Sequence, residues 1–518
     1  MKYICDSKQM KAIDTYTIEE IGIPSLVLME RASLCVAEQM QTLVAAPARI
    51  LVLCGTGNNG GDGMAVARIL AQRGYTVDIF LPATGHRITK EAKKQFEIAK
   101  ALAIPVYDQM DWDSRMSVYD GAIDAFFGIG LQRAIEEPYA SAVQAVNSSG
   151  IPVVAVDMPS GIHTDNGKVC GVAVKADITV TFGYEKPGLL LYPGREYAGK
   201  VVACHIGFPE KQQLPEQLWP KYICYDEEDM KRLPKRPADS HKGTFGRVLV
   251  IAGSEGMSGA CQFAARAAYR MGAGLVQIYT VESNRSILQS TIPEAIVSTY
   301  DNDFSDLESA YEQATAIICG CGIGVSSRSR KLLQKVLLLQ QNHPSKSLVL
   351  DADALNILAE MSAEKGQSFL EVKRESSLFS SEFPMPKGCI LTPHIKELSR
   401  LCGIPVKELA FNLWEVMNQI QDRIPGNCAV LAKDATTLVA GGNHLYMNVS
   451  GCHGMATGGS GDVLAGLIGG LLAQGMDTVE AARLGVFLHG RAGEQASDHR
   501  KAYSIMASDI IESIGVSS

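Results

Sequence analysis

Short apolar runs alternate with helix-like stretches along the first 210 residues of the chain. The runs are rich in β-branched residues and end at Gly, Pro, Asn or Asp, which predicts buried strands. These strands cover residues 49–54, 75–81, 121–130, 151–161, 177–184 and 200–208. Between them, apolar residues recur at helical spacing, as in residues 63–73 and 89–102. Fully apolar strands separated by helices predict a parallel sheet with helices on both faces.

A second alternation of the same kind begins near residue 247. Its predicted strands cover residues 247–254, 275–280, 316–324, 347–356, 388–397 and 427–441. Residues 209–240, between the two alternations, carry five Pro and many charges without clear periodicity, which is typical of a linker. We therefore predict two different α/β domains, residues 1–225 and residues 226–518.

Two segments fall outside the alternation. Residues 7–42 have apolar residues at helical spacing, and we expect them to form helices packed on an edge of the first domain. Residues 364–386 are polar and predict a surface insertion or a hairpin in the second domain.

Composition narrows the class of protein. The 518 residues are 46% hydrophobic and 20% charged, enough for a core in each domain. The 48 Lys and Arg against 56 Asp and Glu give a net charge of −8, which argues against a nucleic-acid scaffold or a polybasic membrane binder. The 13 Cys are scattered without a CxxC pair, and we expect reduced, buried thiols rather than zinc ligands or disulfides.

No segment predicts export or membrane insertion. The first ten residues lack the apolar core of a signal peptide. The longest charge-free apolar stretch near the other end, residues 463–476, is too short to span a bilayer. We expect a cytoplasmic protein with no membrane or nucleic-acid partner.

A glycine-rich loop, residues 55–63, follows the first predicted strand. It matches GxGxxG, and Asp78 lies 18 residues beyond Gly60, as in a dinucleotide-binding fingerprint. However, Asp78 falls inside the second predicted strand rather than at its end. The loop offers free N–H groups at a helix start, suited to a phosphate, and the alternative is a plain tight turn.

Polar residues also follow other strands of the first half. Asp124 lies in the third predicted strand, and Asp157 and Ser160 close the fourth. Because the carboxyl ends of parallel strands share one edge, Asn59, Asp124, Asp157 and Ser160 should converge. Their oxygen atoms suit a hard cation, although each Asp taken alone is equally well explained as a helix cap.

Together these residues resemble the YjeF-N family, the NAD(P)H-hydrate epimerases, over about residues 1–220. The resemblance lies in residues 22–25 (Gly-Ile-Pro-Ser), 28–32 (Leu-Met-Glu-Arg-Ala), 57–63 (Gly-Asn-Asn-Gly-Gly-Asp-Gly) and 157–161 (Asp-Met-Pro-Ser-Gly). It implies a Rossmann-like three-layer αβα domain.

The same resemblance implies a set of site residues. Those that hold the hydrated dinucleotide would be Asn58, Asn59, Gly60, Gly61, Asp62, Gly128, Ile129, Gly130, Leu131, Gln132, Arg133, Ala134 and Asp157. Asn59, Asp124 and Ser160 would ligate a potassium ion. Asp157 would contact the hydrated nicotinamide and act as the proton shuttle, since epimerisation needs only proton transfers with ring opening or water loss.

The second half lacks GxxxxGK[ST] but carries a glycine-rich turn at residues 454–466. The apolar spacing after Asp462 is helical, so the glycines form the first turn of a helix with exposed N–H groups, an anion hole. Asp462 is then placed to take a proton from a hydroxyl during phosphoryl transfer. The alternative is that Asp462 only caps the helix.

This Gly-Ser-Gly-Asp turn resembles the corresponding element of ribokinase-like kinases, and residues 226–518 resemble the YjeF-C family, the NAD(P)H-hydrate dehydratases. The matching segments are residues 241–243, 253–254, 257–260, 320–324, 351–356, 392–398 and 433–437. Two positions depart from the family pattern: Cys321 stands where Pro is common, and Ser460 where Thr is common. Cys321 is expected to alter its turn slightly.

The resemblance again implies roles. The residues that hold the adenine nucleotide would be Lys433, Asp434, Ala435, Thr436, Thr437 and Gly461, and those that contact the hydrate would be Ala260, Gly322, His394 and Asp462. Glu397 would support Mg²⁺ through water. Asp462 would deprotonate the substrate hydroxyl, and a phosphoryl group transferred to that oxygen would then leave as phosphate.

The sequence thus predicts a bifunctional repair enzyme. One domain would interconvert the R and S hydrates of NADH and NADPH (NADHX and NADPHX), and the ribokinase-like domain would dehydrate the S form with ADP, or with ATP as the alternative donor. A homo-oligomer is expected from the family. Two other readings stay open: a vitamin-precursor or sugar kinase fused to a ligand-binding domain, and a binding module without turnover.

Overall fold

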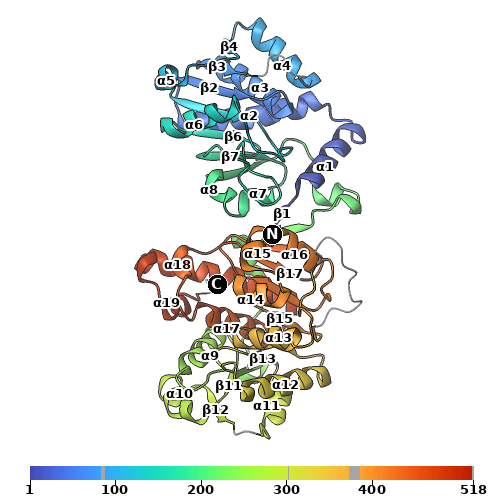
Figure 1. The fold of residues 1–518 in the computed structure, drawn as a ribbon, viewed down its shortest axis with the longest axis vertical. Coiled ribbons are helices and arrows are strands. Elements are labelled where there is room, and N and C mark those ends of the chain that lie inside the picture. Colours follow the sequence, from blue (N-terminus) through green and yellow to red (C-terminus); the bar gives the residue numbers. More distant parts are fainter. Residues whose placement is uncertain (83–87, 301–302, 373–384, 516–518) are drawn as a thin grey trace. The chain divides into compact units, whose positions relative to one another are not determined.

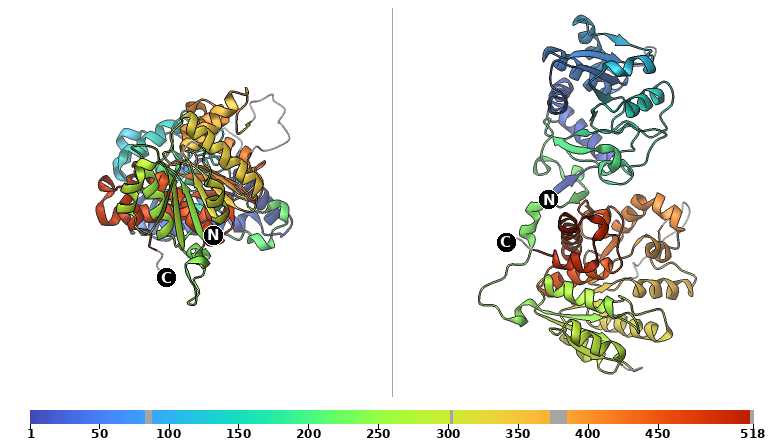
Figure 2. Two further views of the ribbon diagram at one scale, coloured as in Figure 1. Left: turned by 90° about the horizontal axis from the view of Figure 1, so that it is seen from below. Right: turned by 90° about the vertical axis from the view of Figure 1, so that its left-hand side faces the viewer.

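The computed structural model describes residues 1–82, 88–300, 303–372 and 385–515. The chain divides into two compact units, Tyr3–Lys221, and Met1–Lys2 together with Tyr222–Ser518. In each unit, helices cover a sheet that is wholly or largely parallel (Figures 1 and 2). The predicted α/β class is therefore confirmed for both halves of the chain.

Among its described residues, the first unit contains a parallel sheet of seven strands in the order β4-β3-β2-β5-β6-β7-β8. Their bounds are Arg49–Cys54 (β2), Thr76–Phe80 (β3), Val106–Tyr107 (β4), Gly121–Ala125 (β5), Val153–Val156 (β6), Ile178–Phe182 (β7) and Lys200–Cys204 (β8). The order runs outward in both directions from β2 and β5. Ligands bind at such a switch point, outside the carboxyl ends of the strands.

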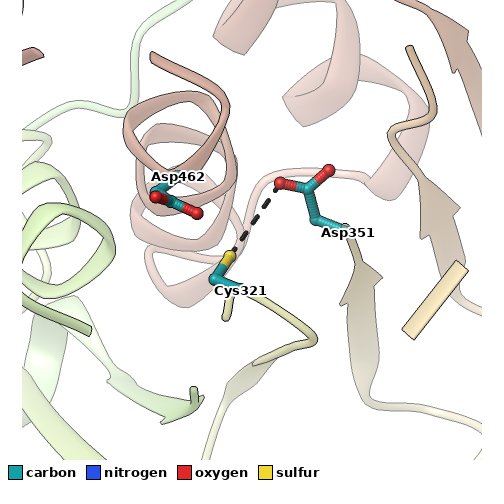
Figure 3. Close-up of side chains that lie close together, drawn as sticks. All are labelled: Cys321, Asp351 and Asp462. Carbon is teal, nitrogen blue, oxygen red and sulfur yellow. Dashed lines mark hydrogen bonds between the residues drawn. The ribbon is translucent and has the colours of Figure 1, made fainter. Parts of the chain in front are cut away.

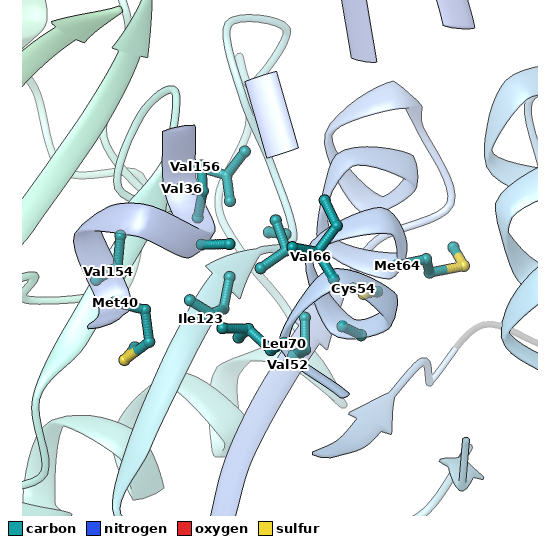
Figure 4. Packing of buried hydrophobic residues seen from close by; sticks show 14 of the residues in the cluster. Val36, Met40, Val52, Cys54, Met64, Val66, Leu70, Ile123, Val154 and Val156 are labelled. Carbon is teal, nitrogen blue, oxygen red and sulfur yellow. The ribbon is translucent and has the colours of Figure 1, made fainter. Parts of the chain in front are cut away.

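Successive residues of β2 enter two different cores, as the two-residue period of a strand requires. Val52 packs with helices on one face of the sheet, and Leu51 packs on the other. Figure 4 shows the first of these cores, where Val36 and Met40 meet the strand residues. The helices of this unit are Ser7–Glu19 (α1), Ser25–Leu43 (α2), Asn58–Gln72 (α3), Lys90–Ala101 (α4), Trp112–Arg115 (α5), Tyr139–Ser149 (α6), Pro187–Leu190 (α7) and Gly194–Ala198 (α8).

The expectation that residues 7–42 pack on an edge is wrong for α2. Its buried side chains, including Val36 and Met40, join the same core as β2, β5 and β6. This helix therefore covers a face of the sheet, because it has a wide apolar stripe to bury.

The second unit has a sheet whose order from β9 onward is β9-β18-β17-β16-β15-β14-β13-β10-β11-β12. The bounds are Tyr222–Cys224 (β9), Arg247–Ile251 (β10), Leu275–Thr280 (β11), Ile296–Thr299 (β12), Ala316–Cys319 (β13), Ser347–Leu350 (β14), Cys389–Leu391 (β15), Ala429–Ala432 (β16), Thr437–Ala440 (β17) and Leu445–Asn448 (β18). Pairing is parallel from β12 to β16, and β17 is antiparallel to both of its neighbours.

The helices of the second unit surround this sheet. They are Ser258–Arg270 (α9), Arg285–Thr291 (α10), Leu307–Gln313 (α11), Ser327–Asn342 (α12), Asp353–Ala363 (α13), Ile395–Cys402 (α14), Val406–Phe411 (α15), Leu413–Gln421 (α16), Ser460–Ala473 (α17), Thr478–Arg500 (α18) and Ala507–Glu512 (α19). Helix α17 packs closely on α9 because Gly466 lies against the backbone oxygen of Ala264, where a Cβ atom would come within 2.3 Å. In the described part of the chain, no helix is both long and apolar enough to cross a membrane.

Several predicted elements differ from the observed ones. The predicted linker, residues 209–240, contains β9, which joins the sheet. Residues 427–441 form two strands rather than one, and β12 and β18 were not expected. Within the predicted insertion, residues 373–384 lie outside the described part of the chain.

Asp78 serves the fold. It is fully buried inside β3, where its Oδ2 accepts hydrogen bonds from Arg49 Nε at 3.1 Å and Nη2 at 2.8 Å, and from the Tyr119 hydroxyl at 2.9 Å. A carboxylate so engaged does not reach the ribose of a dinucleotide, so the GxGxxG match in this chain lacks its usual acidic partner.

Candidate active sites

A cavity of about 830 Å³ opens at the switch point of the first sheet. Its wall comes from the turn between β2 and α3, from the loop that follows β5, and from the end of β6. Helices α1 and α2 and residues Phe182 and Lys186 close the remaining sides. A cavity of this size and position suits a nucleotide-sized ligand.

Close backbone packing shapes the glycine turn beside this cavity. A Cβ atom on Gly60 would lie 1.8 Å from the carbonyl oxygen of Gly55, and one on Gly63 would lie 2.5 Å from Cβ of Ala125. Helix α3 can therefore begin directly at the strand end. Its N-cap, Gly57, provides no side-chain cap, so the N–H groups of the first turn remain available to an anion.

Asp124 and Ser160 form a buried pair beneath the cavity. The Ser160 hydroxyl donates to Asp124 Oδ1 at 2.6 Å, and the Ser160 backbone N–H donates to Oδ2 at 2.7 Å. Burial raises the pKa of Asp124 to about 6, while the hydrogen bonds from Ser160 act in the opposite direction.

Asn59 lies against Gly128, in the loop whose Phe127 contacts Ser160. A Cβ atom on Gly128 would lie 2.9 Å from Asn59 Oδ1, and the neighbouring Phe127 carbonyl lies 3.3 Å from the Ser160 hydroxyl. The buried Asn59 Nδ2 has no hydrogen-bond partner among the described residues. A carboxylate, a hydroxyl, an amide and a backbone carbonyl are a donor set that fits a hard cation such as K⁺.

Asp157 directly follows β6 and has the unusual backbone angle φ of +66°. Its Oδ1 accepts hydrogen bonds from Lys186 Nζ at 2.5 Å, from the Phe182 backbone N–H at 3.1 Å and from the Thr181 hydroxyl at 3.2 Å. A non-glycine residue at positive φ is strained, and such strain concentrates at functional sites. Asp157 also lines the cavity.

The structure brings most of the predicted epimerase residues to one place. Those on the cavity wall are Asn58, Asn59, Asp62, Gly128, Ile129, Gly130, Leu131, Gln132, Arg133 and Asp157. Gly60 and Gly61 pack inside the turn, and Ala134 is not part of the wall. Sequence reasoning missed Lys186 and Asp14, because nothing in the sequence connects either of them to Asp157.

The second site lies where α17 begins, at Ser460. Gly459, the N-cap of this helix, has a φ of +90°, which favours glycine. Gly461 lies over a charged pair: a Cβ atom there would come within 3.3 Å of Lys433 Nζ and 3.6 Å of Asp351 Oδ2. The helix start, Lys433 and Asp351 thus meet at the carboxyl edge of the sheet.

Asp351 directly follows β14, and Lys433 directly follows β16. Lys433 Nζ donates to Asp351 Oδ1 at 2.8 Å, and the Thr392 hydroxyl donates to the same oxygen at 2.6 Å. Although burial opposes both charges, each partner shifts the other: the pKa of Asp351 is lowered and that of Lys433 is raised. Both groups are therefore charged at neutral pH.

Asp462, the third residue of α17, lies close to this pair. Figure 3 shows Cys321 between Asp462 and Asp351, with its Sγ 3.9 Å from Asp351 Oδ2. Burial, followed by the charge of Asp351, raises the pKa of Asp462 to about 6. Burial and the two carboxylates raise the pKa of the Cys321 thiol well above its usual value, so it is a neutral thiol. Cys321 therefore contacts side chains of the site itself. From the sequence, only a slight change of its turn was expected.

His394 caps α14. Its Nδ1 accepts the backbone N–H groups of Lys396 at 3.0 Å and Glu397 at 3.2 Å, while Glu397 Oε2 accepts the His394 N–H at 2.8 Å. Burial and the charge of Lys433 lower the pKa of His394, so the ring is neutral and carries its proton on Nε2. Burial raises the pKa of Glu397 to about 7. Both side chains therefore have a structural task beside Lys433.

The remaining predicted residues lie around this centre. Gly322 faces Ala260, since a Cβ atom on Gly322 would lie 3.0 Å from Cβ of Ala260. The segment from Asp434 to Thr436 forms the turn between β16 and β17, next to Lys433, and Thr437 is the first residue of β17. Sequence reasoning missed His489, which is buried on α18 with Nε2 3.3 Å from the Ser460 hydroxyl. Burial lowers the pKa of His489 to about 4, so it is neutral.

Comparison with known proteins covers both units. A family model described as YjeF-related protein N-terminus matches residues 25–188, and one described as NAD(P)H-hydrate dehydratase matches residues 248–515. The bifunctional NAD(P)H-hydrate repair enzyme Nnr of Thermofilum pendens is 34% identical over 95% of this chain and 91% of its own length. The Nnr protein of Coxiella burnetii is 33% identical over 100% of this chain and 99% of its own.

Solved structures resemble the second unit. A ribokinase-like superfamily protein from Enterococcus faecalis is 27% identical, with a TM-score of 0.48, over 58% of this chain and 96% of its own. The ADP/ATP-dependent NAD(P)H-hydrate dehydratase from Bacillus subtilis, co-crystallised with ATP and Mg²⁺, is 28% identical, with a TM-score of 0.45, over 56% of this chain and 95% of its own.

The fold and the sites together define an α/β enzyme of two units. The site of each unit combines a helix that begins after a glycine with an aspartate that directly follows a strand. The full-length similarity specifies this class further. The chain belongs to the family of bifunctional NAD(P)H-hydrate repair enzymes.

Replacing Gly60 with Ala should destabilise the first unit. The added Cβ atom would collide with the Gly55 carbonyl, and we expect a loss of about 2–3 kcal/mol in the free energy of unfolding. Gly57→Ala is the matched control, because a Cβ atom there meets nothing within 4 Å in the described part of the chain and its backbone is extended. Urea unfolding monitored by hydrogen exchange in β2 and α3 measures both variants. Equal stability of the two would contradict the close-packed turn.

Proposed function

We propose that this chain carries two activities: epimerisation of the R and S hydrates of NADH and NADPH in the first unit, and nucleotide-dependent dehydration of the S hydrate in the second. The observation that carries the proposal is that each unit holds its own site, in a chain similar over its whole length to bifunctional repair enzymes. Spontaneous hydration gives both epimers, so an enzyme that dehydrates one of them gains from a partner activity that supplies it.

In the first unit, the nucleotide part of the substrate would lie along the start of α3 and the loop from Gly128 to Arg133. Free N–H groups and flexible polar side chains there suit a pyrophosphate. The hydrated ring would lie against Asp157, whose position in the cavity supports a role in proton transfer. Asn59, Asp124 and Ser160 would hold K⁺, which would fix the loop that ends at Gly128 and supply positive charge near the substrate.

In the second unit, the nucleotide would bind at Lys433 and the segment from Asp434 to Thr437. Its terminal phosphoryl group would face the N–H groups at Gly461 and the start of α17. Mg²⁺ would offset phosphate charge there, with Glu397 nearby. The hydrate would contact Ala260, Gly322 and His394.

The reaction of the second unit would be phosphoryl transfer followed by elimination. Asp462 takes the proton from the hydroxyl on the hydrated carbon, and the oxygen forms a bond to the terminal phosphorus while the bond to the nucleotide leaving group breaks. With ADP the leaving group is AMP. The carbon–oxygen bond then breaks, phosphate departs with the electron pair, and loss of a proton from the neighbouring carbon restores the double bond. Phosphate leaves far more readily than hydroxide.

Two single substitutions should separate the activities. Asp157→Asn should slow interconversion of the R and S hydrates by about 10²-fold or more, because it removes the proposed proton acceptor. Asp462→Asn should reduce NADH formation from the S hydrate by a similar or larger factor. Chromatography of the two hydrates and NADH absorbance measure these rates.

Asp113→Asn and Asp498→Asn, both exposed, are the matched controls in the first and second unit. Loss of both activities in either test variant, with the fold intact, would show that the sites are not separate. Unchanged rates in both would contradict the assignment of roles.

The dehydratase should lose activity as the pH falls through about 6. Burial and Asp351 raise the pKa of Asp462 to about 6, and only the ionised form accepts a proton. At pH 5 the value of kcat/KM should be about tenfold below its plateau. Initial rates of NADH formation from pH 5 to 8 test this. A profile that is flat down to pH 5 would contradict Asp462 as the base.

Removing potassium should impair the epimerase. Exchange of K⁺ for choline should slow interconversion of the hydrates by about 10- to 100-fold, as loss of a ligand-orienting group does in metal sites. The Ser160→Ala variant should interconvert the hydrates slowly with either K⁺ or choline, because it lacks one of the proposed K⁺ ligands. Titration with KCl at constant ionic strength provides the measurement. A wild-type rate that is independent of K⁺ would exclude a functional potassium site.

A further inference from the structure

Lys186 is the buried cation of the epimerase cavity. Its side chain is 1% exposed, and its ammonium donates to three acceptors: Asp157 Oδ1 at 2.5 Å, the Thr181 hydroxyl at 2.7 Å and the Phe182 carbonyl at 3.0 Å. Three donors and three acceptors leave no N–H for a substrate. Lys186 therefore acts on any ligand only through Asp157.

The two oxygens of Asp157 are used differently. All three hydrogen bonds to its carboxylate, from Lys186, Thr181 and the Phe182 N–H, end on Oδ1. Oδ2 accepts none within the described residues, and Asp157 lines the cavity. The carboxylate is thus held by one oxygen, while the other remains available to a ligand.

Asp62 lines the same cavity but, unlike Asp157, has no paired cation among the described residues. Its carboxyl group has no ion pair and no hydrogen bond with any residue that the structure describes, and the charged groups that act on it are Asp157 and Asp14. Burial, followed by these two carboxylates, raises the pKa of Asp62 well above its usual value. Lys11 and Arg133 also line the cavity, but neither pairs with Asp62. Asp62 is therefore the carboxyl group of this cavity whose protonated form is favoured.

Epimerisation of a hydrated ring requires both a donor and an acceptor of protons. If water leaves, the departing hydroxyl needs a proton, the ring nitrogen supplies the electron pair for a C=N bond, and the water that adds to the other face loses a proton. If the ring opens, the hydroxyl loses its proton as a carbonyl forms, the C–N bond breaks, and the nitrogen gains a proton. The ring-opening route returns both groups to their starting states when the ring closes again. The water-loss route leaves the proton on the acceptor, and proton exchange with solvent then restores both groups. Neither route needs an oxidant or a reductant.

We propose that Asp62 is the proton donor and Asp157 the proton acceptor of the epimerase site, and that Lys186 is the positioning residue that assigns these roles. Two carboxyl groups in one cavity take different protonation states when only one of them has a cation. Lys186 supplies that cation to Asp157, and the same ammonium orients Oδ2 toward the ligand. This proposal rests on the epimerase activity proposed above.

The test follows interconversion of separated R and S hydrates of NADH by the full-length protein from pH 5 to 9, without added nucleotide. Asp62→Asn should lower kcat by about 10²-fold and change KM by less than about threefold. It should also remove the basic limb of the pH profile, since that limb reports loss of the donor's proton.

Lys186→Met should lower kcat by about tenfold or more and change KM by less than about threefold, because the ammonium no longer holds Asp157 Oδ1 in place. Lys186→Arg should restore kcat in part, since it keeps a charged hydrogen-bond donor. A lysine with only a structural task would change the yield of folded protein and leave kcat of the folded fraction unchanged.

Hydrogen exchange in β2 and α3 reports whether the first unit of each variant is folded, because the dehydratase lies in the other unit. A kcat within about threefold of wild type in folded Lys186→Met overturns the positioning role. A retained basic limb in Asp62→Asn, or a rate within about threefold of wild type, overturns the donor role. If Lys186→Met does not fold, the proposal is judged on Asp62→Asn alone. If the wild-type protein does not interconvert the hydrates, the proposed epimerase function itself fails.

Discussion

Both sites depend on a lysine that pairs with an aspartate directly after a parallel strand; the lysine is buried in the first unit and largely buried in the second. In the first unit the pair is Lys186 with Asp157, and in the second it is Lys433 with Asp351. Taking such charges out of water is costly, and the cost is offset only when the pair is close and its remaining donors and acceptors are satisfied. Thr181 meets this condition in the first unit, as Thr392 does in the second.

Each pair has a second carboxyl group beside it whose pKa is raised. Asp62 lies in the first half of α3 and Asp462 in the first turn of α17, both next to glycines that allow the helix to begin at the sheet edge. Burial raises the pKa of each. The two units thus share one physical arrangement: a carboxylate paired with a lysine, beside a second carboxyl group whose pKa is raised by burial.

The sequence predicted those parts of the fold that depend on local pattern. Strands β2 and β11 have the predicted bounds, because a continuous β-branched run ending in a turn residue leaves little choice. Strand β9 was missed because three residues in a charged segment give no periodic signal, and they become a strand only by pairing with β18. Helix α2 covers a face rather than an edge because its partners lie in strands distant in the sequence.

The site residues were likewise predictable only where a local sequence motif carries them. Residues carried by contiguous motifs, such as Asn59 and Asp157, lie on the cavity wall, where the motif places them. Lys186 and His489 carry no motif signal, since each meets its partner 29 residues away in the chain and only after folding. For His394 the sequence shows the motif but not its structural role. Only the structure shows that this side chain caps α14.

The central claim is that one chain returns both hydrates to NADH. The most direct measurement is the yield of NADH from an equal mixture of R and S hydrates, with K⁺, Mg²⁺ and either ADP or ATP, together with the phosphate released. The account predicts recovery of nearly all of the hydrate, with one phosphate for each NADH. A yield that stops at the S fraction would contradict the epimerase, and NADH formed without phosphate release would contradict the phosphoryl-transfer route.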